Sequence, residues 1–231
     1  MSVLVRSPEQ LDAVLAWTPP APLARPELVY CDFEDLRRYR EAVDRARAAG
    51  MPVGLATLRI QKPGEEGLDR IVPSYDLNWA QLSALVQASD PHWYEVVVHQ
   101  HMPMFHMEHC VFAAFLSTGK DWRDCGRPCD HHKLELRDRV GAAFPVAPDA
   151  GCRNTVYNGH AQSAAEYVGR MRALGLRHFR VELLRETPEQ VGPLLERYAR
   201  VLVGLDDGRD TWRHLRALNQ VGLTRGTLQL V

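Results

Sequence analysis

Four of the five cysteines lie in one polar stretch that is also rich in histidine, and they are Cys110, Cys125, Cys129 and Cys152. Thiols gathered in this way bind a metal ion, hold an iron–sulfur cluster or form disulfides. Fourteen residues separate Cys110 from Cys125, three separate Cys125 from Cys129, and twenty-two separate Cys129 from Cys152. The chemistry of these thiols is therefore the first question that the sequence poses.

The spacing of the four cysteines favours some of these alternatives over others. The two CxxC knuckles of a zinc ribbon are missing. In the CGRPC segment, Gly126 and Pro128 suit a tight turn that presents both sulfurs to one point. Wide and irregular spacing fits an iron–sulfur cluster wrapped by a larger domain somewhat better than it fits zinc. From spacing alone, a cluster, zinc and the absence of any metal all stay open.

Histidines crowd the same region. His99, His101, His106 and His109 lie in HQHMPMFHMEHC, and His131 and His132 follow Cys129. A helix would place His106 and His109 on one face, although HMEH is not the HExxH motif of a zinc protease. A single histidine more often hydrogen-bonds locally, but imidazoles gathered near four thiols indicate a pocket with acid–base or substrate-binding capacity.

Three arginines, Arg123, Arg127 and Arg153, flank the cysteines. They could bind an anionic substrate, balance the charge of a thiolate-bound cluster, or form structural ion pairs. Cys31 stands apart at the end of an apolar run, where a small buried residue is the expected role.

Composition narrows the class of protein. The chain has 231 residues, of which 45% are hydrophobic and 25% charged, as in an ordinary globular domain. Its formal net charge of −1 gives no global field toward nucleic acid or membranes. We see neither a signal peptide nor an apolar run long enough to span a bilayer, so we expect a cytoplasmic protein. Disulfides are rare in that compartment, which favours metal or cluster ligation.

Alternating strand and helix signals predict a parallel α/β unit. The expected strands cover 28–31, 51–60, 94–99 and 178–184, with a hairpin over 133–138 and 144–147. The expected helices cover 33–50, 79–88, 107–116 and 163–174, a further one opened by Thr187, and a last one over 212–221. Residues 19–27 form a proline-rich connector, and QKPGEEG forms a polar loop. The prediction is a single domain over 1–231 that forms part of a TIM-like barrel, with an inserted hairpin.

With these segments in view, the chain resembles the collagenase-like peptidase family, peptidase family U32, in its large-protein branch. The matching segments are DFEDLRRYREAV, LATLRIQKPGEEG, PSYDLN, VVVHQHMPMFHMEHCVFAAFLSTG, DCGRPCDHHKLELRDRVG, GCRNTVYNG and LRALNQVGLTRGTL. Relatives usually have further strand–helix units before PSYDLN, so the resemblance implies a TIM-like barrel that is incomplete here. Many relatives also carry a cysteine where this chain has Ala113.

The resemblance implies a [4Fe–4S] cluster held by Cys110, Cys125, Cys129 and Cys152, with zinc as the alternative. It also implies a part in hydroxylation of RNA or of a small ring-containing metabolite. We then expect His99, His101, His106 and His109 near the open face of the cluster, and Arg123, Arg127 and Arg153 at the substrate.

Two other functions remain open. The family name suggests a metal-dependent, collagenase-like peptidase, although the sequence shows no activated nucleophile and no water-activating motif. A non-catalytic subunit stabilised by a cluster or by zinc is the third alternative. In that case a partner chain would complete the barrel.

Overall fold

One mixed β-sheet organises the molecule in the computed structural model, which describes residues 1–35, 37–56, 70–119, 123–218 and 223–228. Its strands are β1 (Ser2–Val5), β2 (Leu28–Cys31), β3 (Val53–Leu55), β4 (Glu95–Met107), β5 (Leu134–Arg137), β6 (Ala143–Asp149), β7 (Arg153–Ser163), β8 (His178–Glu182) and β9 (Leu223–Thr224). They follow the order β3-β2-β1-β8-β4-β7-β6-β5, and β9 pairs with β7.

The helices of the described residues are α1 (Pro8–Ala16), α2 (Arg38–Ala48), α3 (Trp79–Gln87), α4 (Val111–Leu116), α5 (Val168–Ala173), α6 (Pro188–Val203) and α7 (Gly208–Leu218). Four 3₁₀ turns accompany them, η1 (Pro91–Trp93), η2 (Pro128–Asp130), η3 (Ala165–Tyr167) and η4 (Gly226–Leu228). None of these helices combines the length and the apolar character that a membrane crossing requires.

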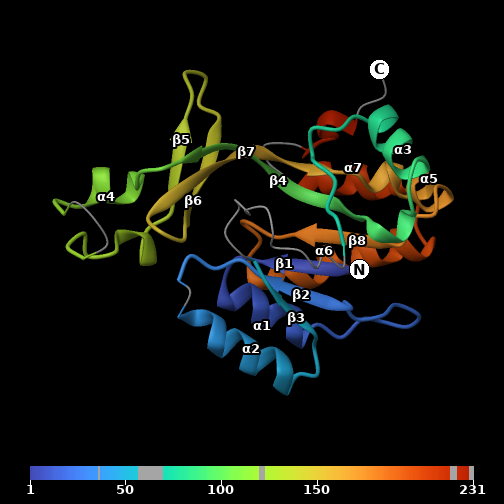
Figure 1. Cartoon of the computed structure of the whole chain (residues 1–231), viewed down its shortest axis with the longest axis horizontal. Helices are drawn as coiled ribbons and strands as arrows, with labels where there is room; N and C mark the ends of the chain where they lie inside the picture. The colour runs from blue at the N-terminus through green and yellow to red at the C-terminus, as the bar shows by residue number, and fades with distance from the viewer. Residues whose placement is uncertain (36, 57–69, 120–122, 219–222, 229–231) are drawn as a thin grey trace.

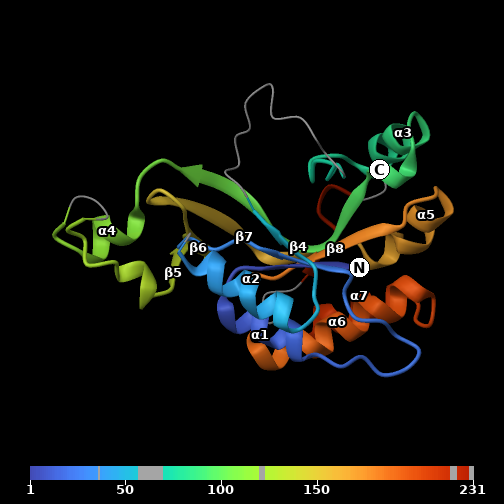
Figure 2. The ribbon, with the colours of Figure 1, turned by 60° about the horizontal axis from the view of Figure 1, so that its bottom comes forward.

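Strands β3, β2, β1, β8 and β4 run parallel to one another. Figure 2 shows α1, α2 and α6 covering one side of this part of the sheet. Val3 and Val5 of β1 are fully buried in the same core as Leu11 and Val14 of α1. Apolar side chains alternating along a strand and recurring along a helix bring the two elements together.

Local signals start the helices. Ser7 caps α1 by accepting a hydrogen bond from the Gln10 N–H at 3.2 Å, and Pro8 fills the first turn, where its missing N–H has no cost. Asn78 and Gln81 form a reciprocal capping box at the start of α3, with both hydrogen bonds at 3.0 Å.

The other half of the sheet is antiparallel and forms a projecting lobe (Figure 1). After pairing with β8, strand β4 continues and pairs with β7 as far as the match of Met107 with Asn154. Register shifts on both sides of Pro103 bend the pair, because proline cannot donate to the ladder. The hairpin of β5 and β6 extends the lobe.

The carboxyl ends of the parallel strands all face this lobe. In Figure 1, β1 starts at the N-terminus on the side away from the lobe, and the parallel pairing gives β2, β3, β8 and β4 the same direction. Functional residues in parallel α/β folds gather at this edge.

The mixed α/β class and the hairpin are confirmed. The described strands form an open path with β3 and β5 at its ends, so barrel closure stays a prediction. The strand predicted over 28–31 matches β2, and the proline-rich connector is irregular, as expected. Most of QKPGEEG and the end of the 51–60 strand lie outside the described residues.

Two predicted helices were partly wrong for one reason. The helix expected over 107–116 starts at Val111, and the region of the helix expected over 163–174 holds η3 followed by the short α5. The reason is the pairing of β4 with β7, which extends β4 to Met107 and forms a strand, β7, that the sequence reading missed. Strand β1 and helix α1 were also missed. Tertiary pairing overrode local periodicity.

A buried polar network fastens β4 to α6 and β7. His99 Nδ1 lies 3.1 Å from the Tyr198 hydroxyl, and its Nε2 lies 3.3 Å from Glu186 Oε1. The Tyr198 hydroxyl also lies 2.7 Å from Ser163 Oγ, and the Leu184 N–H donates to Glu186 at 2.8 Å. Burial alone would raise the pKa of Glu186, but the hydrogen bond and charge interaction with His99 outweigh it and lower the pKa to about 2.

We therefore predict that Glu186 makes the fold acid-sensitive. Because its pKa falls on folding from 4.5, its stabilisation is present above that pH and is lost as the pH falls toward 2. The loss amounts to about 3 kcal/mol. Urea unfolding over this pH range should show a smaller acid dependence in Glu186→Gln than in the wild type. Glu196→Gln, a control in α6, should keep the wild-type acid dependence, and an unchanged slope in Glu186→Gln would contradict the prediction.

Candidate cysteine centre

The lobe positions Cys110 at the start of α4. Its sulfur accepts a hydrogen bond from the Ala113 N–H at 3.5 Å, so the thiol caps the helix. The residues after it are apolar, and Phe112 is buried in the small core of the lobe with Val146 and Val156. Packing of Phe112 thus fixes where the Cys110 sulfur lies.

Cys125 and Cys129 lie on either side of a tight turn. Gly126 and Arg127 both have positive φ, 70° and 52°, and Pro128 starts η2. The Arg127 N–H donates to the Cys125 sulfur at 3.4 Å. Glycine adopts this backbone without cost, whereas arginine does so at about 1 kcal/mol.

Cys152 occupies the turn between β6 and β7 with φ 61°. Two residues later, fully buried Asn154 accepts a hydrogen bond from the Val111 N–H at 2.6 Å. Arg153 forms an ion pair of 3.1 Å with Glu108. These contacts hold the turn of Cys152 against the segment of Cys110.

Packing against one small core links Cys110 with Cys129. Cys110 and Cys129 both lie against the small core of Phe112, Val146 and Val156, and they interact electrostatically. All five cysteines lie in the described residues, and no disulfide joins any of them. In the described chain, Arg127 and Cys152 are the two non-glycine residues with positive φ, and both belong to the cysteine segments. Such backbone outliers often occur at functional sites.

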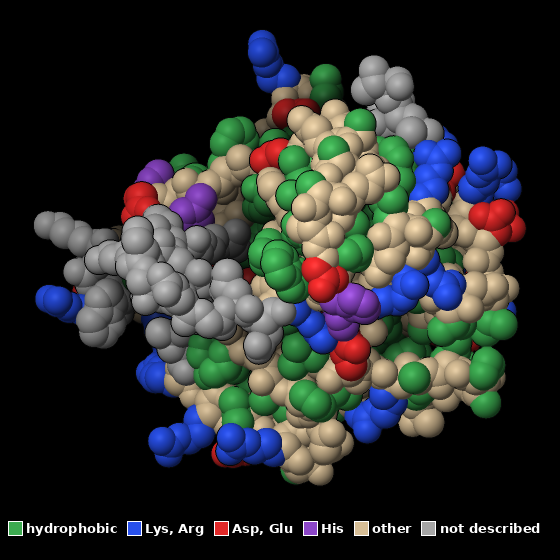
Figure 3. All heavy atoms as spheres, turned by 45° about the vertical axis from the view of Figure 1, so that its right-hand side comes forward, with side chains coloured by type: hydrophobic (Ala, Val, Ile, Leu, Met, Phe, Trp, Pro, Cys, Tyr) green, Lys and Arg blue, Asp and Glu red, His purple; other side chains and the backbone are tan. Residues whose placement is uncertain are grey.

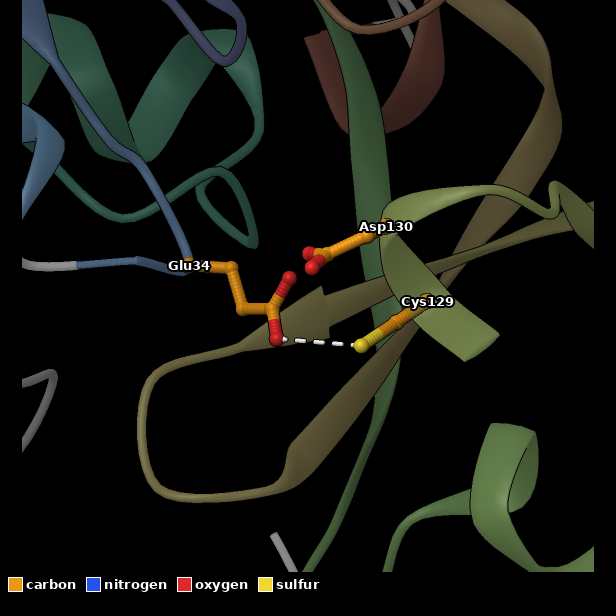
Figure 4. Close-up of side chains that lie close together, drawn as sticks. All are labelled: Glu34, Cys129 and Asp130. Atoms are coloured by element: carbon orange, nitrogen blue, oxygen red, sulfur yellow. Dashed lines mark hydrogen bonds between the residues drawn. The ribbon is translucent and has the colours of Figure 1, made fainter. Parts of the chain in front are cut away.

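Cys129 also contacts the loop that follows β2. Its thiol donates to Glu34 Oε1 at 3.2 Å, and Figure 4 shows Glu34, Cys129 and Asp130 pointing toward one another. Donor atoms of these three side chains all lie within 4.8 Å of one another and could hold a metal ion. Arg127 partly neutralises the group, since it pairs with Asp130 at 3.1 Å and with Asp35 at 3.3 Å.

The metal-free Cys129 thiol is a poor nucleophile. Burial, the hydrogen bond to Glu34 and the nearby carboxylates raise its pKa to about 12. Burial likewise raises the pKa of Glu34. A thiolate at this position therefore needs a compensating positive charge, which a bound metal would supply.

A cleft of about 890 Å³ separates the lobe from the carboxyl edge of the parallel strands. One wall comes from that edge, with Arg6, Asp32 and Glu34. The lobe forms the other wall, which includes His106 and Cys129. The cleft is large enough for a small-molecule ligand.

Of the four predicted catalytic histidines, His106 lines the cleft. Its Nδ1 lies 3.0 Å from Thr155 Oγ1 and 3.3 Å from Asp149 Oδ2, and the Thr155 hydroxyl donates to the same carboxylate. Thr155 and Asp149 thus share one ring nitrogen. This differs from a nucleophile–histidine–acid relay, in which the histidine uses both nitrogens.

The other three histidines lie elsewhere. His99 and His101 are buried, and His101 Nδ1 lies 2.8 Å from the Asn158 carbonyl oxygen. Burial is the largest influence on His101 and lowers its pKa. His109 is exposed in the bend before α4, so it shares no helix face with His106. Catalytic roles for the four histidines stay predictions.

The three predicted substrate arginines differ in their surroundings. Arg153 lines the cleft and pairs with Glu108, Arg127 pairs with Asp35 and Asp130, and Arg123 is exposed. Arg127 and Arg153 thus form structural ion pairs, and binding of a substrate by the three arginines stays a prediction. Cys31 is fully buried, as expected, and burial raises its pKa to about 11.

The sequence reading missed Glu34, Asp130, Asp149 and Thr155. A signal existed for Glu34, which follows β2 at the carboxyl edge, where polar side chains of parallel strands gather. For Asp149 and Thr155 the contact with His106 depends on the pairing of β4, β6 and β7, which local patterns did not reveal.

Comparison with curated proteins and with solved structures finds no match. The sequence model of peptidase family U32 matches residues 56–224, which include all four cysteines of the lobe and most of the cleft wall that the lobe forms. Since this match covers well over half of the chain, the protein belongs to peptidase family U32.

Proposed function

We propose that this protein holds a [4Fe–4S] cluster through Cys110, Cys125, Cys129 and Cys152 and takes part in hydroxylation of RNA or of a small ring-containing metabolite. One observation carries the proposal. Hydrogen bonds and packing gather four cysteines, none of them in a disulfide, from separate segments into one lobe beside a cleft.

A single zinc ion would need the lobe thiols closer together than they lie. Sulfurs around one zinc lie ~3.8 Å apart. No three of the four lobe thiols, all of which are described, come within 4.8 Å of one another. A cubane cluster takes one thiolate at each of four irons, so it needs a wider set of ligands. A zinc ion would instead fit the donor atoms of Glu34, Cys129 and Asp130, which lie closer together.

When bound, such a cluster would supply electron transfer. The residues of this chain would bind the substrate and exchange protons with it. His106, oriented by Asp149 and Thr155, can exchange a proton with a molecule in the cleft, and Arg153 can bind an anionic group there.

Peptidase activity receives little support from the geometry. The thiol of Cys129 is held protonated, and Thr155 is fully buried and donates to Asp149. Neither group is an activated nucleophile of the kind that peptidases use.

Charge distribution bears on the choice between the two substrate classes. On the face in Figure 3, the described Lys and Arg side chains lie in separate groups interspersed with acidic ones. A nucleic-acid backbone is usually bound by a continuous basic surface. This distribution, together with the net charge of −1, favours a small molecule over a long RNA.

The cluster is tested by iron and sulfide analysis after anaerobic purification. Cys125→Ser removes one ligand, so we expect loss of the visible sulfur-to-iron absorbance and of most iron and acid-labile sulfide. Cys31→Ala changes the one cysteine outside the lobe and should keep the wild-type iron content. Colourless wild-type protein with one zinc, or full iron in Cys125→Ser, would refute the ligand set.

Asn154 is predicted to support the cluster by holding α4 in place. Asn154→Ala leaves the buried Val111 N–H without its acceptor, at a cost of about 1–3 kcal/mol, and should lower the iron content on aerobic exposure. Asn158→Ala is the matched control, because it removes a side-chain hydrogen bond from the same strand, to the His160 N–H. Equal rates of iron loss in both variants would contradict the prediction.

The reaction is tested in a deletion strain. Mass spectrometry of its RNA nucleosides and of its ring-containing metabolites should show loss of one hydroxylated species, restored by the wild type and not by Cys125→Ser. Cleavage of gelatin that survives removal of iron would instead establish the peptidase.

A further inference from the structure

A second cavity, of about 330 Å³, lies beside the cleft on the face of the parallel strands away from α1. Leu4, Arg180 and Glu182 line it, and they alternate along β1 and β8 with buried Val3, Val5 and Val181 of the main core. We call this cavity the inner pocket. Its volume lies at the lower end of the range for small-molecule sites.

The inner pocket is adjacent to the cleft but chemically different from it. Arg6, Asp32 and Ala56 line both cavities. The described lining of the inner pocket includes no cysteine and no histidine. A ligand of the inner pocket is therefore recognised by side chains other than the cysteines and histidines of the lobe.

Two partly buried arginines line the inner pocket and supply donors to it. Arg6 donates to the Leu183 carbonyl oxygen at 2.6 Å and to Glu182 at 3.2 Å. Arg180 lies 3.0 Å from Glu182, and its side chain is 13% exposed. The Nε atom of Arg180 is buried without a hydrogen-bond partner, whereas the Nε atom of Arg6 lies 3.4 Å from the Asp32 carboxylate. A buried donor normally has an acceptor, so the Nε–H of Arg180 calls for one.

Carboxylates outnumber the arginines. Asp32 lies 3.4 Å from Arg6 Nε, Glu182 lies between the two arginines, and Glu95 lies 3.8 Å from Arg180. Two formal positive charges thus face three formal negative ones. Each of these charges already lies within ion-pair distance of one of opposite sign, so the group offers no unpaired charge to an added ion.

The remaining walls fit a compact apolar body. Val72, Pro73, Leu77, Leu82 and Leu228 line the pocket. Gln100 and Gln162 add a buried pair of amides, in which Gln100 Nε2 donates to Gln162 Oε1 at 2.9 Å. Apolar walls with a few convergent polar groups are typical of a site that orients a small ligand.

We propose that the inner pocket binds a small uncharged molecule that presents a carbonyl oxygen and an N–H group on a compact apolar body. The carbonyl oxygen accepts from the Nε donor of Arg180, and the N–H donates to Asp32 or Glu182. The proposal does not depend on what the four cysteines hold.

Three probes with one ring and different charges test this class. Benzamide is neutral and has both groups, benzoate is an anion, and benzamidine is a cation at neutral pH. Saturation-transfer NMR and calorimetric titration of the purified full chain should show that benzamide binds about tenfold or more tightly than either ion. Tighter binding of benzoate or benzamidine, or no binding of benzamide, would overturn the proposal.

Variants locate the binding. Arg180→Gln should weaken benzamide about tenfold or more, because a hydrogen bond from a charged donor is lost. Val72→Trp fills the pocket from its partly exposed rim without removing a buried charge, and it should abolish binding. Exposed Arg209→Gln is the control and should bind as the wild type does. Unchanged binding in Val72→Trp with a native circular dichroism spectrum would place the site elsewhere.

Iron content separates this inference from the proposed cluster. Cys125→Ser should lose iron and still bind benzamide, whereas Arg180→Gln should keep iron and bind it weakly. Failure of the cluster and failure of the inner pocket are thereby measured independently.

Discussion

Everything in the cysteine lobe depends on the pairing of two long strands, β4 and β7. Strand β4 has thirteen residues, and its first part lies parallel to β8 inside the main core. Its second part leaves that core and pairs antiparallel with β7. A single strand thus belongs to both halves of the sheet. It connects the lobe to the main core and so helps to fix where the lobe thiols lie. Bends around Pro103 set the direction in which the lobe projects.

This arrangement places the lobe opposite the carboxyl edge of the parallel strands. Loops at that edge carry several of the charged side chains that face the cleft, including Arg6, Asp32 and Glu34. Burying several charges together is costly unless they pair. Here Arg6 lies within ion-pair distance of Asp32 and Glu182. The pairing lets one edge of the sheet keep polar groups next to a core made of valine and leucine.

Local signals predicted the parts of the fold that local interactions form. Residues 28–31 form a strand as expected, and the capping pattern at Thr187 and Pro188 marked the start of α6 correctly. The reading failed where long-range pairing decides the structure. The sequence reading assigned no strand to residues 101–107 and began a helix at Met107, yet this segment pairs with β7. Likewise the cysteine spacing indicated ligands, but neither the contact of Glu34 with Cys129 nor that of Asp149 with His106 can be read from spacing.

The contact between Glu34 and Cys129 links the state of the thiol to the placement of the lobe. As a neutral thiol, Cys129 donates to Glu34 and joins η2 to the loop after β2. As a thiolate it would face the carboxylates of Glu34 and Asp130 without a proton between them, and like charges repel strongly in a partly buried site. A positive centre that binds the sulfur removes that repulsion, and Arg127, held between Asp35 and Asp130, already offsets part of the negative charge. Ligation of Cys129 therefore has to release a proton and change the same contact that joins the two walls of the cleft.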